Sequence, residues 1–61
     1  MNYLVNLIYD SGITTRRYST LARASQEAKT AVAYPDGPYR AAVYDRNYRL
    51  IWTCHRQVET A

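Results

Sequence analysis

Residues 3–9, with the sequence YLVNLIY, carry apolar side chains on both of the faces that alternate along an extended chain. Val5 and Leu7 fall on one face, and Leu4 and Ile8 fall on the other. In a β-strand this pattern is typical of a position in the middle of a sheet. We therefore expect the first strand of the chain to be a central strand.

A polar strand is expected directly after it. Residues 10–12, Asp-Ser-Gly, form a turn signal, and Gly12 supplies the left-handed conformation needed at the end of such a turn. Residues 13–18, ITTRRY, return with mostly polar side chains and two adjacent arginines. Charged side chains are typical of an edge strand, because they discourage pairing with another chain.

A helix is predicted from about residue 20 to residue 33. Ser19 suits the N-cap position, with Thr20 as the alternative. Pro35 disfavours helical geometry at the residue before it and therefore ends the helix. One face has small and aliphatic side chains at helical spacing, so it can lie close to a sheet while burying little apolar area. These side chains are Leu21, Ala24, Ala28, Ala31 and Val32.

Residues 39–54, YRAAVYDRNYRLIWTC, are predicted to form a second β-hairpin. Its closing loop is Asp45-Arg46-Asn47, with Asn47 in the left-handed position and Tyr44 and Tyr48 as flanking residues.

The whole chain, residues 1–61, is therefore predicted to be a single small α+β domain of ββαββ order. Placing the two most apolar strands, residues 3–9 and 39–44, in the centre gives a four-stranded antiparallel sheet in the order 2-1-3-4. One helix would pack on one face of this sheet and cannot cover both. The open face is therefore a candidate interaction surface.

The predicted loop also assigns the side chains of the second hairpin to the two faces. Ala41, Val43 and Ile51 would lie under the helix. A shift of one residue in the turn would re-pair the faces, and in that alternative Trp52 and Leu50 belong to the core. With the loop as predicted, the open face carries Arg40, Ala42, Tyr44, Tyr48, Leu50 and Trp52.

The small size of the chain bears on its stability and its location. A chain of 61 residues with the single cysteine Cys54 lacks the usual staples of a small domain, so a homodimer or a bound partner would supplement its core. The first residues lack the basic lead-in of a signal peptide, and no apolar run is long enough to span a membrane. We expect a cytoplasmic protein that does not enter a membrane.

Catalytic and metal chemistry find little support in the sequence. His55 is the only histidine, and Cys54 has no evident base. Three aspartates stand at turn positions, where Asp is favoured for backbone reasons, and two glycines are too few for a phosphate-binding loop. We expect no enzymatic activity, no cofactor and no metal site.

The net charge of +3 comes with seven arginines, seven tyrosines and one tryptophan. Arginine, tyrosine and tryptophan are enriched at the energetic centres of protein interfaces. The leading interpretation is a protein partner with an acidic surface, bound by Arg40, Tyr44, Arg46, Tyr48, Arg49, Leu50 and Trp52. The alternative is a nucleic acid, because arginines can contact phosphates while tyrosines stack on bases. Its further contacts would be Arg16, Arg17 and Tyr18.

The segment YSTLARASQEAKTAV, followed by a Pro/Gly turn and by YRAAVYD, resembles the layout of many small phage and mobile-element proteins. These include the phage inhibitor of host RNA polymerase and several anti-CRISPR proteins. The shared features are Ser/Thr-Leu before an alanine-rich helix, a Pro-x-Gly break and an antiparallel hairpin, over about residues 18–52. The resemblance implies a protein that binds and blocks a host protein or complex, and it assigns no site residues. The basic charge departs from the acidic, DNA-mimicking members.

Overall fold

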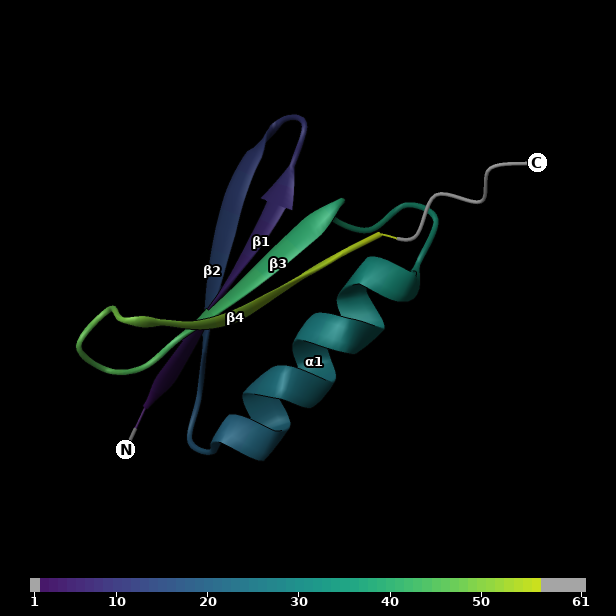
Figure 1. Cartoon of the computed structure of the whole chain (residues 1–61). Coiled ribbons are helices and arrows are strands. Elements are labelled where there is room, and N and C mark those ends of the chain that lie inside the picture. Colours follow the sequence, from purple (N-terminus) through teal and green to yellow (C-terminus); the bar gives the residue numbers. More distant parts are fainter. Residues whose placement is uncertain (1, 57–61) are drawn as a thin grey trace.

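The computed structural model describes residues 2–56, which form one antiparallel sheet and one helix. The strands lie in the order β2-β1-β3-β4, and α1 runs along one face of the sheet (Figure 1). This is the ββαββ, α+β arrangement that the sequence predicts, including the strand order. The elements are β1 (Tyr3–Tyr9), β2 (Gly12–Tyr18), α1 (Leu21–Ala33), β3 (Arg40–Tyr44) and β4 (Leu50–His55).

The core lies between α1 and the central strands and is built from small side chains. Ala24 and Ala28 are fully buried, which lets the helix approach the sheet closely. Leu21 was also expected on the buried face of the helix, but it stands in the first helical position and is 38% exposed. The buried cluster consists of Val5, Leu7, Ala24, Ala28, Val32, Ala41 and Val43.

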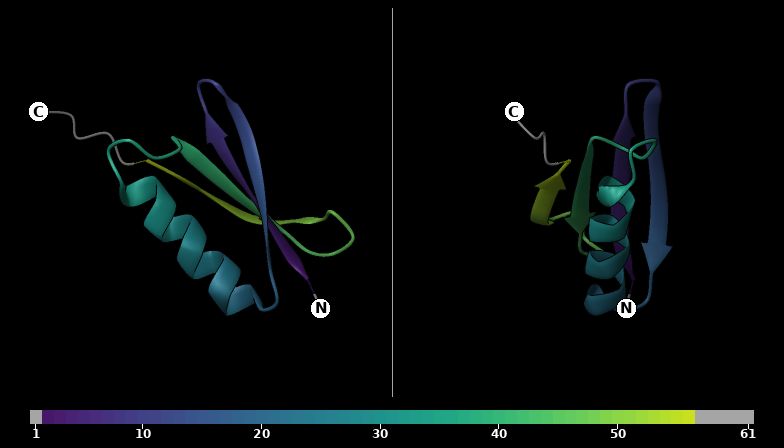
Figure 2. Two further views of the ribbon diagram at one scale, coloured as in Figure 1. Left: turned by 180° about the vertical axis from the view of Figure 1, so that it is seen from behind. Right: turned by 90° about the vertical axis from the view of Figure 1, so that its right-hand side faces the viewer.

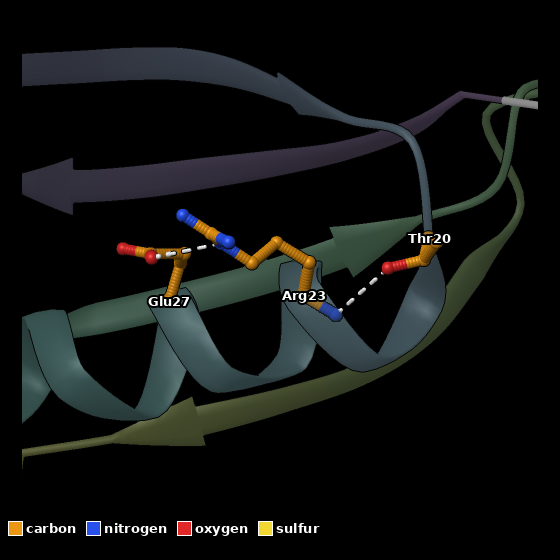
Figure 3. A network of polar contacts seen from close by, with 3 residues as sticks. All are labelled: Thr20, Arg23 and Glu27. Atoms are coloured by element: carbon orange, nitrogen blue, oxygen red, sulfur yellow. Dashed lines mark hydrogen bonds and ion pairs between the residues drawn. The ribbon is translucent and has the colours of Figure 1, made fainter.

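Both ends of α1 follow from local sequence. Thr20, the alternative cap, is the N-cap: its hydroxyl oxygen accepts a hydrogen bond from the Arg23 N–H at 3.1 Å. One turn further on, Arg23 Nε lies 3.3 Å from a carboxylate oxygen of Glu27 (Figure 3). At the other end Tyr34 adopts an extended conformation before Pro35, as the sequence predicts.

The connection from α1 to β3 is closed by Gly37. A β-carbon on this residue would collide with the carbonyl oxygen of Ala31, so the connection requires glycine. The carbonyl oxygen of Gly37 accepts a hydrogen bond from the Arg56 guanidinium, and the Arg56 N–H donates to the Tyr39 carbonyl oxygen at 2.8 Å. The end of β4 is therefore tied to the residues that lead into β3.

The β3–β4 loop differs from the prediction by one residue. Asp45 accepts hydrogen bonds on one carboxylate oxygen from the N–H groups of Asn47 (2.8 Å) and Arg49 (3.0 Å). The Asp45 N–H also donates to the Arg49 carbonyl oxygen, so these two residues flank the loop in place of Tyr44 and Tyr48. The left-handed residue is Tyr48, with φ of 63°, and not Asn47. The loop projects from the sheet away from α1 (Figure 2).

A β-bulge in β4 changes the faces of the residues that follow it. Tyr44 pairs with Leu50 and Val43 pairs with Trp52, which leaves Ile51 as the extra residue. Because side chains alternate with a period of two, one extra residue moves every later side chain to the opposite face. Trp52 therefore lies on the helix side and Ile51 is outside the core cluster, so both face assignments from the sequence are wrong.

Candidate binding surface on the open sheet face

The open face, which is the sheet face opposite α1, is organised in three rows that cross all four strands. Val5, Leu7, Ala41 and Val43 point toward the helix, so their neighbours along each strand point away from it. The strand register aligns these neighbours from β2 to β4. The tip row is Arg17, Leu4, Tyr44 and Leu50; the middle row is Thr15, Asn6, Ala42 and Thr53; the far row is Ile13, Ile8, Arg40 and His55.

The tip row is the most apolar and aromatic part of this face. The ring of Tyr44 lies 5.8 Å from the ring of Tyr48 at an interplanar angle of 51°, a favourable tilted arrangement. Leu50, on the strand next to Tyr44, is 55% exposed, and Tyr48 is 64% exposed. Leu4 lies in the same row but is only 9% exposed. The tip row and the neighbouring Tyr48 therefore combine a covered aliphatic residue with one exposed ring and an exposed leucine.

A shallow hollow lies where the β3–β4 loop meets the tip row. Leu4 and Arg17 line it from the sheet, and Arg46 and Tyr48 line it from the loop. These residues come from three separate segments of the chain. The fold thus brings Arg17 and Arg46, which are far apart in sequence, to one hollow that Tyr48 also lines.

The middle row is lined by small and polar side chains. The Thr15 hydroxyl donates a hydrogen bond of 2.8 Å to the side-chain oxygen of Asn6. Ala42 is buried despite lying on the open face, because larger neighbours surround it. The side chains along the middle of the open face are therefore smaller than those of the tip row.

The open face has arginines but no carboxylate among the residues that the structure describes. Asp10, Asp36 and Asp45 lie in connections, and the Asp45 carboxylate is occupied by backbone N–H groups of its own loop. Glu27 lies on the helix, where it pairs with Arg23, the one ion pair found within residues 2–56. Arg17 and Arg40 in the rows, and Arg46 in the adjoining loop, therefore have no ion-pair partner among residues 2–56.

Trp52 does not belong to the open face. Its Nε1–H donates a hydrogen bond to the Ser25 hydroxyl at 3.1 Å, and the Lys29 ammonium lies 5.8 Å from its ring centroid. The ring packs against the core cluster and is half-buried. The alternative that places Trp52 under the helix is therefore correct, whereas Leu50, which that alternative also placed there, is on the open face.

The proposed nucleic-acid contacts do not share one surface. Arg17 is on the open face, while Arg16 and Tyr18 point to the helix side and line a hollow between α1 and β2 together with Tyr34. Arg49 is exposed at the end of the β3–β4 loop, outside the three rows. Of the predicted partner-binding set, the structure gathers Tyr44, Arg46, Tyr48 and Leu50 near the tip row and places Arg40 in the far row.

Sequence reasoning missed Leu4 and Asn6 as members of this face. Their strand is apolar on both faces, so its pattern identified a central strand without distinguishing the covered face. The signal that would have found them is the register with β3, which aligns Leu4 with Tyr44.

The thiol of Cys54 and the residue types that bind metals are the remaining candidates for chemistry in the described part of the chain. Burial raises the pKa of the half-buried Cys54 thiol, while the charge of Lys29 and a backbone hydrogen bond from Ala41 act in the opposite direction. Within residues 2–56 no three His, Cys, Asp or Glu side chains come together as metal ligands would. The helix of the described region is too short and too polar to cross a membrane.

No family model matches the chain, and searches of curated proteins and of solved structures give no significant match.

Proposed function

We propose that this chain is a small, non-enzymatic binding protein that uses its open face to dock on an acidic surface of a partner protein. The observation that carries the proposal is the hollow beside the tip row, which Arg17 and Arg46 line together with the exposed Tyr48. Arginine can bind a carboxylate through two hydrogen bonds, and tyrosine supplies rigid apolar area with one polar end. This combination fits a protein surface that presents carboxylates beside apolar groups.

The exposed aliphatic residues favour a protein over a nucleic acid as the partner. Leu50 is largely exposed next to the tyrosine pair, and Ile13 is exposed at the other end of the open face. Aliphatic side chains gain free energy by packing into apolar pockets, whereas single-stranded nucleic acids are bound mainly by stacking on aromatic rings. Tyr44 offers little free ring surface, because it is half-buried and packs against Tyr48.

The backbone of Tyr48 supports a binding role for its side chain. A bulky residue with φ of 63° is uncommon, and glycine or asparagine would adopt this conformation at lower cost. Strained positions of this kind concentrate at binding sites, where the side chain is needed for another reason. The tyrosine ring at this position lies beside the hollow, and we infer that its contact with a partner is that reason.

Because the sequence layout resembles that of small phage and mobile-element proteins, we propose a host protein or complex as the target. In this proposal the domain acts by occlusion: the open face covers a surface that the target needs for its own interactions. A cytoplasmic location follows from the same proposal.

The proposal is tested by affinity capture from a bacterial lysate with a matched pair of leucine variants. Leu50→Asp places a negative charge in the tip row, whereas Leu21→Asp places the same change on the exposed first turn of the helix. Proteins bound through the open face should be lost with Leu50→Asp and retained with Leu21→Asp, as quantified by mass spectrometry. Retention of all captured proteins by Leu50→Asp would contradict the proposal.

Nucleic-acid binding is the second candidate, and the absence of carboxylates from the open face among residues 2–56 is the observation that favours it. The test is binding to a labelled single strand and a labelled duplex at about 50 mM and about 200 mM salt. A steep loss of affinity with added salt would indicate phosphate contacts and would favour this candidate. Absence of binding at micromolar protein would exclude it.

A further inference from the structure

The two edges of the sheet differ in how they are protected against pairing with another strand. β2 carries the adjacent charged residues Arg16 and Arg17. β4 has the sequence LIWTCH and carries no Asp, Glu, Lys or Arg side chain. Charged side chains normally guard edge strands, because an unpaired edge is a template for a further strand. Only the β2 edge of this sheet has that protection.

Within residues 2–56 no strand pairs with the outer side of β4, so part of its backbone has no strand partner there. The Arg56 N–H donates to the Tyr39 carbonyl oxygen, so the backbone groups of these two residues point toward each other. Backbone groups alternate in direction along an antiparallel strand, so Trp52 and Cys54 also face β3. The N–H and C=O groups of Thr53 therefore point away from the sheet, and no strand of the described residues lies beyond them.

The same alternation can be followed across the register to the other edge. Thr53 pairs with Ala42, Ala42 with Asn6, and Asn6 with Thr15. The backbone groups of Thr53 point away from β3, so those of Ala42 and Asn6 point toward each other and those of Thr15 point away from β1. The N–H of Thr15 therefore points outward from β2. The sheet thus has two threonines in one row, at opposite edges, with equivalent outward backbone groups.

We propose that β4 pairs with β4 of a second copy of this chain, antiparallel and about a two-fold axis, so that the two four-stranded sheets become continuous. Self-pairing of this strand places no like charges opposite each other, whereas pairing of β2 with itself would bring Arg16 and Arg17 of two copies together. The regular stretch available for pairing begins at Trp52, after the bulge. A two-fold axis at this edge is the closed, self-complementary arrangement typical of small homodimers.

The small side chains of the core favour a second copy of the chain as the partner that pairs with the β4 edge. The fully buried side chains of the domain include two valines and a proline as the largest. Leu50 and Ile51 are exposed beside the free edge, and Ile51 is 38% exposed. Pairing through β4 would satisfy the free backbone groups and cover apolar area that a single domain leaves in water. It would also join two open faces into one surface, although the dimer does not depend on the proposed function.

The first test compares proline at the two equivalent threonines by sedimentation equilibrium over a wide range of protein concentrations. Thr53→Pro removes an outward N–H from the β4 edge, and Thr15→Pro removes the equivalent group from the β2 edge. The wild-type protein and Thr15→Pro should be dimers, and Thr53→Pro should be a monomer. A monomeric wild type at high micromolar concentration, or a Thr53→Pro dimer, would overturn the proposal.

The second test uses the wild-type protein, so it stands even if a proline variant fails to fold. Hydrogen exchange of the Thr53 amide is compared with that of the Thr15 amide at low and high protein concentration. In the dimer the Thr53 amide should be protected, and its protection should grow with concentration while the Thr15 amide exchanges rapidly throughout. Equal and concentration-independent exchange of both amides would rule out pairing through β4.

Discussion

The left-handed backbone of Tyr48 gives a prediction whose sign depends on a single dihedral angle. Tyr48→Gly and Tyr48→Ala both remove the ring and its contact with Tyr44. They differ in that alanine keeps a β-carbon, which at φ of 63° is crowded against the backbone, whereas glycine adopts this conformation freely. The difference between the two variants therefore isolates the backbone term.

The expected difference in the free energy of unfolding follows from the cost of the left-handed backbone. A left-handed conformation costs a residue with a β-carbon about 1–2 kcal/mol, and glycine loses about 0.5–1 kcal/mol more conformational entropy on folding than alanine. Tyr48→Gly should therefore be at least as stable as Tyr48→Ala, with an advantage of up to about 1.5 kcal/mol. In an ordinary strand or turn with negative φ the order would be reversed, because only the entropy difference would remain.

The assay is urea unfolding followed by the fluorescence of Trp52, the only tryptophan of the chain. For a domain this small the dependence on urea is about 1 kcal/mol per M, so the two midpoints should differ measurably. A midpoint for Tyr48→Ala above that of Tyr48→Gly would refute the left-handed conformation of this residue. Partner binding should be lost in both variants, because both remove the ring.

Three further predictions concern the core, the α1–β3 connection and the thiol. Trp52→Ala should lower the free energy of unfolding by about 2–4 kcal/mol in a denaturant titration followed by circular dichroism, because the half-buried ring and its Ser25 hydrogen bond are lost; a change below about 0.5 kcal/mol would mean an exposed ring. Gly37→Ala should lower the melting temperature, at a cost of about 1–3 kcal/mol, because its β-carbon meets the Ala31 carbonyl oxygen, and an unchanged melting temperature would contradict that contact. The raised pKa of the Cys54 thiol predicts slower alkylation at neutral pH in the folded protein than in urea, and equal alkylation rates would show an open thiol. It also predicts that the free energy of unfolding falls as pH rises above the pKa of the unfolded thiol, because the unfolded state loses its proton first.

The strand order could be predicted because it depends on features that the sequence pattern displays directly. A strand that is apolar on both faces, Tyr3–Tyr9, has to be central, and a strand with adjacent arginines suits an edge. The helix end before Pro35 follows from local chemistry, whereas the N-cap is the alternative Thr20 and not the expected Ser19.

The position of Trp52 could not be predicted because a bulge leaves no trace in the pattern of β4. The loop shift alone would have kept Trp52 on the open face, since it moves the pairing of Tyr44 from Tyr48 to Leu50, a step of two residues. The extra residue Ile51 then reverses the faces. Neither Leu50, Ile51 nor Trp52 is polar, so the hydrophobic pattern fits either arrangement.

The left-handed residue of the β3–β4 loop was misplaced for a different physical reason. Asn47 has the residue type that tolerates this conformation, so propensity alone selects it. The Asp45 carboxylate accepts hydrogen bonds from the N–H groups of Asn47 and Arg49, and these bonds close the loop one residue later. Side-chain hydrogen bonds to the backbone thus override the propensity of a single residue.

The neighbouring arginines of β2 allow the most direct measurement of the central claim, that the open face is the binding surface. Arg17→Glu and Arg16→Glu change the net charge equally, but Arg17 is on the open face and Arg16 is on the helix side. The affinity of each variant for the captured partner is measured by titration calorimetry. Loss of binding with Arg17→Glu alone is the predicted result, and loss of binding with Arg16→Glu alone would contradict the account.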